Sequence, residues 1–141
     1  MNDMGLFDED YRLKKLSEKG DPLVKLDKVM DWELFRPILD RVFKPQEKDD
    51  SLGGRPHYDY VMMFKILVIQ QFHNLSDERT EFEINDKLTF MRFLGLRLGD
   101  SVPDTNTIWA FREELTKAKA IKELFNIFNK ILDKQGIIAR K

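Results

Sequence analysis

The residues best suited to a chemical role lie on one predicted helix, over residues 105–117. The side chains there that can form hydrogen bonds, stack or carry charge are Thr105, Asn106, Thr107, Trp109, Arg112 and Lys117. Asn can make two hydrogen bonds to adenine, Thr can bond a base or touch a thymine methyl group, and Arg and Lys can pair with phosphates. A helix N-terminus also offers free backbone N–H groups to an anion. These residue types are suited to contact with double-stranded DNA.

The helical period separates these polar side chains from a buried stripe. Three apolar residues recur on one face: Ile108, Phe111 and Leu115. At about 100° per residue, the opposite face holds Asn106, Trp109, Ala110, Glu113 and Lys117, with Thr107 and Arg112 on its flanks. An alternative interpretation is an ordinary solvated face with Trp109 packed on the N-terminal arm. Arg112 could then pair with an acidic neighbour such as Asp104.

Arg55 is a second candidate for DNA contact. It lies in the run Gly53-Gly54-Arg55-Pro56, which resembles the centre of arms that enter the minor groove. An extended Arg is attracted to a narrow minor groove because the electrostatic potential there is more negative. The alternative is an ordinary turn that precedes a helix.

The residue patterns of an enzyme do not assemble in this sequence. There is no cysteine, and the only histidines are His57 and His73. Neither histidine has an Asp or Glu at metal-ligand spacing on one helix face. A glycine-rich phosphate loop of the usual spacing is also missing from the sequence. We therefore expect no catalytic residue, metal or cofactor in this chain.

The element expected to position the polar helix is a helix over residues 60–73. It is apolar nearly all round, which is typical of a helix enclosed by others. It is too short to cross a bilayer, which takes about 20 apolar residues. Asp59 is expected to cap its start, and Asn74 lies where the helix leaves its last turn.

The whole chain is predicted to be all-α, a multi-helix bundle around this central helix. We expect further helices over about 8–19, 76–87, 89–94 and 118–135, with a fresh start or a kink at Pro37. The helices between Ser76 and Lys117 read as a helix-turn-helix-like module. The predicted divisions are a helical N-terminal arm (1–43), a linker (44–58), a helical DNA-binding module (59–135) and a tail (136–141).

Composition narrows the class of protein. A chain of 141 residues suits one domain or a domain with an arm. The formal net charge is −1, but residues 105–141 carry 8 basic and 4 acidic side chains. We therefore expect any polyanion to bind in this part of the chain. Acidic residues crowd positions 3–10, which does not resemble a signal peptide. We expect a cytoplasmic protein without a membrane segment.

Several motifs in a fixed order resemble the N-terminal region of bacterial transposases of the insertion-sequence-5 type. They include Gly54-Arg-Pro56 with Tyr58-Asp59, Asn74-Leu-Ser-Asp77, Phe90-Met-Arg-Phe-Leu-Gly-Leu96, Val102-Pro-Asp104, and Thr107-Ile-Trp109 with Phe111-Arg-Glu113. The resemblance covers nearly the whole chain. One departure is His57, where that family usually has a second proline.

The resemblance implies a DNA-binding head that recognises the terminal inverted repeats of the element. In that family the head precedes a ribonuclease-H-like domain with an Asp-Asp-Glu triad and two divalent metals. No position here matches the triad, so the chain would be a truncated copy, a first reading frame or an excised domain. The run Ile137-Ile138-Ala139 would then lack its sheet, and we predict disorder or edge-to-edge association there.

A second hypothesis is a helical interaction module. It would form a homodimer through the N-terminal arm or the last helix, or join an intact transposase in a mixed assembly. Steep weakening of DNA binding with salt would favour the first hypothesis, because phosphate neutralisation releases counterions. Salt-insensitive self-association without DNA binding would favour the second.

Overall fold

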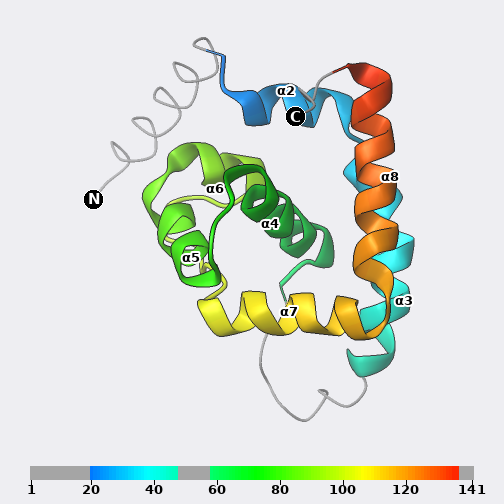
Figure 1. The fold of residues 1–141 in the computed structure, drawn as a ribbon. Coiled ribbons are helices and arrows are strands. Elements are labelled where there is room, and N and C mark those ends of the chain that lie inside the picture. The colour runs from blue at the N-terminus through cyan, green and yellow to red at the C-terminus, as the bar shows by residue number, and fades with distance from the viewer. Residues whose placement is uncertain (1–19, 48–57, 137–141) are drawn as a thin grey trace.

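The structure is a computed structural model that describes residues 20–47 and 58–136. These residues form seven α-helices and one 3-10 helix, and no strand occurs among them. The predicted all-α class is confirmed. In Figure 1, α4 (Tyr60–His73) lies in the middle, α5 (Asp77–Asp86) and α6 (Leu88–Leu94) lie to its left, and α7 (Thr105–Lys117) runs below it. No helix of the described ranges is both long and apolar enough to cross a membrane.

Helix α4 is the predicted central helix. It packs against α3, α5, α6, α7 and the 3-10 helix, and half of its residues are buried: Val61, Met63, Phe64, Ile66, Leu67, Val68 and Ile69. The Asp59 side chain accepts a hydrogen bond from the Met62 amide at 3.1 Å, and Asn74 ends the helix with a φ of 53°. Lys65, its one basic residue within the apolar run, donates to the Phe93 carbonyl at 2.9 Å.

The N-terminal side of the bundle comprises α2 (Pro22–Val29), the 3-10 helix η1 (Trp32–Phe35) and α3 (Arg36–Glu47). Pro37 lies in the first turn of α3, so the predicted fresh start is confirmed. Trp32 and Phe35 are buried, and their rings contact the Phe64 ring with centroids 6.3 and 4.7 Å away. This aromatic contact attaches the N-terminal segment to α4.

Helix α3 extends beyond its predicted end. It continues to Glu47, so residues 44–47 of the predicted linker (44–58) are helical and the linker start is corrected to after Glu47. The physical reason is tertiary contact: the Gln46 amide donates to Glu114 on α7 at 3.1 Å, and the Tyr60 hydroxyl donates to Glu47. The predicted first helix (8–19), residues 48–57 of the linker and residues 137–141 of the tail lie outside the described residues.

In the second half of the chain the helices lie close to their predicted ranges, and local signals set their ends. Ser76 caps α5 through the Arg79 amide, Gly95 ends α6, and Gly136 ends α8 (Ala120–Gln135). Helix α8 begins two residues later than predicted because Lys119 has a left-handed φ of 58° and interrupts the helical path. Ten residues, 95–104, separate α6 from α7, more than the three- or four-residue turn of a helix-turn-helix. The helix-turn-helix assignment therefore stays a prediction.

Candidate nucleic-acid interface

Helix α7 has the two faces that its sequence predicts. The Asp104 side chain accepts from the Thr107 amide at 2.8 Å and caps the helix. Ile108, Phe111 and Leu115 are buried against the core. The side of α7 opposite these three residues therefore lies outside the core. The contacts between α7 and its neighbouring helices determine where that side lies on the molecule.

The first turn of α7 is attached to α5. The Thr105 amide and the Thr105 hydroxyl both donate to one carboxylate oxygen of Glu81, at 2.8 and 2.7 Å. Thr105 was predicted to contact DNA, but its hydroxyl group donates its hydrogen bond to Glu81 within the protein. Glu81 was not among the predicted site residues. The sequence shows only a charged residue on a polar helix and does not reveal which residue it contacts. The contact determines where the N-terminus of α7 lies.

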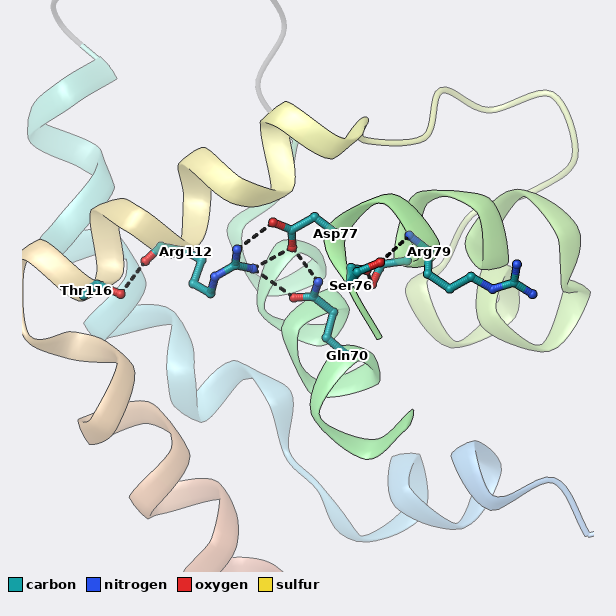
Figure 2. Close-up of polar contacts among 7 residues, drawn as sticks. Gln70, Ser76, Asp77, Arg79, Arg112 and Thr116 are labelled. Atoms are coloured by element: carbon teal, nitrogen blue, oxygen red, sulfur yellow. Dashed lines mark hydrogen bonds and ion pairs between the residues drawn. The ribbon is translucent and has the colours of Figure 1, made fainter. Parts of the chain in front are cut away.

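The middle of α7 is attached to both α4 and α5 through Arg112. Its guanidinium donates to the two carboxylate oxygens of Asp77 at 2.8 and 2.6 Å, and to the Gln70 side-chain oxygen at 3.2 Å. The Gln70 amide in turn donates to Asp77 at 2.7 Å. Figure 2 shows these three side chains converging from three helices. We call Gln70, Asp77 and Arg112 the polar bridge.

The polar bridge is partly buried and electrostatically matched. The Arg112 and Asp77 side chains are 31% and 15% exposed. The hydrogen bonds from Arg112 hold the pKa of the Asp77 carboxyl below its ordinary value, and Asp77 raises the pKa of Arg112. The sequence suggested Asp104 as an alternative partner of Arg112, but Arg112 pairs with Asp77. Arg112 was predicted near phosphates, and its Nη atoms are instead engaged with the protein.

The outward side of α7 exposes the remaining predicted residues. Asn106, Ala110 and Lys117 are exposed, and Trp109 keeps 53% of its surface accessible. Thr107 is half-buried on the flank. Arg55 lies outside the described residues. The structure therefore brings Asn106, Trp109 and Lys117 together on one exposed face, which we call the α7 face.

The α7 face offers varied polar chemistry with little net charge. An amide and an indole lie near its start, and Lys117 at its end lies 3.5 Å from the Glu114 carboxylate. Half-buried Glu113 adds a negative charge next to them. Across residues 20–47 and 58–136, no group of three or more His, Asp or Glu side chains is arranged to hold a metal. This face can donate and accept hydrogen bonds and present an aromatic surface.

Comparison with known families identifies the chain. No solved structure matches it. A family model described as "Transposase domain (DUF772)" matches residues 11–114, which include α2 to α6, most of α7, Asn106, Trp109 and the polar bridge. Because this match spans well over half of the 141 residues, the chain belongs to this transposase-domain family.

Proposed function

We propose that this chain is the DNA-binding N-terminal region of a transposase of the insertion-sequence-5 type, and that the α7 face contacts the terminal inverted repeats of the element. The observation that carries the proposal is that α7 exposes polar and aromatic side chains while hydrogen bonds hold the helix itself in place. Asn106 and Trp109 face solvent, while Thr105 and Arg112 on the same helix are hydrogen-bonded to α5.

Rigid support matters because reading a base edge requires a side chain held at a defined position. A groove-binding helix gains discrimination from bidentate hydrogen bonds, and each is worth about 1–3 kcal/mol against the wrong base. Asn106 lies in the first turn of α7, and recognition helices contact base edges through the side chains of their N-terminal residues. It is therefore the residue we assign to base contact.

The test is the change Asn106→Ala. We expect it to lower the preference for the repeat duplex over a scrambled duplex by about 1–3 kcal/mol, because the amide is the group proposed to contact a base. Fluorescence anisotropy with both duplexes measures the preference. Gln71→Ala on α4 is a matched control that removes another exposed amide and should leave the preference unchanged. Equal weakening on both duplexes would show that Asn106 reads no sequence.

The second candidate function is a protein-interaction module that modulates an intact transposase. Its support is the pair of large exposed rings on adjacent helices, Phe82 on α5 and Trp109 on α7, each 53% accessible. Aromatic residues of this kind are enriched in protein interfaces. Sedimentation equilibrium without DNA distinguishes the two functions: a dimer that dissociates in Trp109→Ala favours interaction, and a monomer that binds duplex favours DNA contact.

A further inference from the structure

Under the proposed function, the α7 face lacks the positive charge that duplex binding needs. Lys and Arg that neutralise phosphates supply nearly all of the non-specific affinity of a protein for DNA and a large share of the specific affinity. On α7, the Arg112 guanidinium bonds Asp77 and Gln70, and Lys117 is offset by Glu114. Phosphate contacts must therefore come from another surface of the molecule.

The outer face of α8 carries that charge. Leu124, Phe128 and Leu132 are the buried side of the helix. At about 100° per residue, the residues opposite them fall within an arc of roughly 140°. The exposed basic and amide side chains on this arc are Lys122, Asn126, Asn129, Lys130 and Lys134. Together with exposed Lys119 at the preceding turn, we call them the α8 face.

The acidic side chains of this surface are fewer than its lysines, and Glu123 is already paired. Glu123 accepts from Arg41 of α3 at 2.7 Å, and this ion pair offsets its charge. Because Arg41 neutralises Glu123, the four lysines of the α8 face outweigh the carboxylates beside them.

The chemistry of the α8 face fits a polyanion better than a protein partner. Protein interfaces depend on a few large apolar or aromatic anchors. The large exposed apolar residues of the described chain are Leu34, Phe72, Phe82, Leu98 and Trp109, and none lies on α8. Lysines interleaved with Asn amides are instead typical contacts to phosphate oxygens. A helix of 16 residues extends about 24 Å, enough to follow several successive phosphates of one strand.

We propose that the α8 face binds the phosphate backbone of duplex DNA, whereas the α7 face contacts bases. This assignment rests on the proposed DNA-binding function and divides it between two helices. The left-handed turn at Lys119 connects them, so the charged face begins where α7 ends. The α8 face then supplies affinity without sequence preference, and neutralising its lysines should weaken binding to every duplex equally.

The test uses the full chain and a labelled 24-base-pair duplex of mixed sequence, titrated over a series of salt concentrations. The variant is Lys122→Gln, Lys130→Gln and Lys134→Gln combined. We expect the slope of log K against log salt to become shallower by about 2–3, close to 0.9 for each phosphate that is no longer neutralised. The matched control combines Lys25→Gln, Lys28→Gln and Lys44→Gln, which are exposed on α2 and α3. The control should keep the wild-type slope, and circular dichroism should show both triple variants folded.

The outcomes separate this inference from the proposed function. If the α8 triple variant keeps the wild-type slope while Asn106→Ala still reduces repeat preference, the α8 assignment is overturned and the proposed function stands. If wild-type protein binds no duplex, both are overturned. A poly-glutamate chain serves as the second probe. Equal binding of poly-glutamate and duplex, abolished together in the variant, would assign the α8 face to an acidic protein partner instead.

Discussion

Helices α4 and α7 are almost equal in length, 14 and 13 residues, but they have opposite relations to solvent. Helix α4 is surrounded, and its polar side chains Lys65 and Gln70 are hydrogen-bonded to α6 and α5. Helix α7 buries one stripe and exposes the other side. We infer that α4 provides stability and α7 provides a surface, so substitutions on the two helices should affect different measurements.

The largest effect is expected for Phe64→Ala on α4. Phe64 is fully buried and its ring meets those of Phe35 and Phe125 at centroid distances of 4.7 and 5.3 Å. Removing it leaves a cavity, and we expect a decrease of about 3–5 kcal/mol in the free energy of unfolding. Urea unfolding measures it. Phe82→Ala is the matched control, because Phe82 is 53% exposed and its removal should cost no more than about 0.5 kcal/mol. Similar decreases in both variants would contradict the central position of α4.

A smaller effect is expected for Arg112→Met in the polar bridge. This change leaves the partly buried Asp77 carboxylate without its guanidinium partner. We expect a decrease of about 1.5–3 kcal/mol in unfolding free energy, the range for hydrogen bonds to charged groups. The control is Arg41→Met, which removes a far more exposed ion pair with Glu123 and should cost at most about 1 kcal/mol. If the two variants are destabilised equally, the bridge is no stronger than a surface pair.

The polar bridge also predicts a dependence of stability on pH. Arg112 lowers the pKa of Asp77 in the folded state, so the unfolded state binds the proton more tightly. The resulting stabilisation is fully present above the unfolded pKa of about 3.9 and is lost as pH falls through the folded-state pKa. Unfolding midpoints between pH 7 and pH 2 should therefore fall less steeply for Asp77→Asn than for wild type. Parallel curves would mean that Asp77 contributes nothing to the acid sensitivity.

The smallest effect on stability is expected for Trp109→Ala on the α7 face. With 53% of its surface exposed, the indole contributes little to the core, and the unfolding free energy should change by no more than about 0.5 kcal/mol. The same change should weaken binding to the repeat duplex, because the indole is available to pack on sugars or bases. Thermal unfolding and anisotropy titration measure the two quantities. Strong destabilisation together with unchanged binding would reverse the roles of α4 and α7.

Much of the fold was predictable because its signals are local. The apolar run over residues 60–73 indicated an enclosed helix, and Asp59 indicated its start, which is confirmed. Side-chain periodicity also separated the buried and exposed sides of α7 correctly. The order of short motifs indicated a transposase-family region, which the family match over residues 11–114 confirms. These features depend on residues a few positions apart, so the sequence contains them without any knowledge of packing.

The partners of the polar side chains, in contrast, depend on how the helices pack. Arg112 pairs with Asp77, 35 residues away in sequence, and Thr105 pairs with Glu81, 24 residues away. Packing also left the lysines of α8 on one accessible face and extended α3 to Glu47. Periodicity shows which side of a helix faces inward, but the partner of a charged side chain depends on how neighbouring helices cross. That crossing is set by the packed core as a whole, and no short stretch of sequence encodes it.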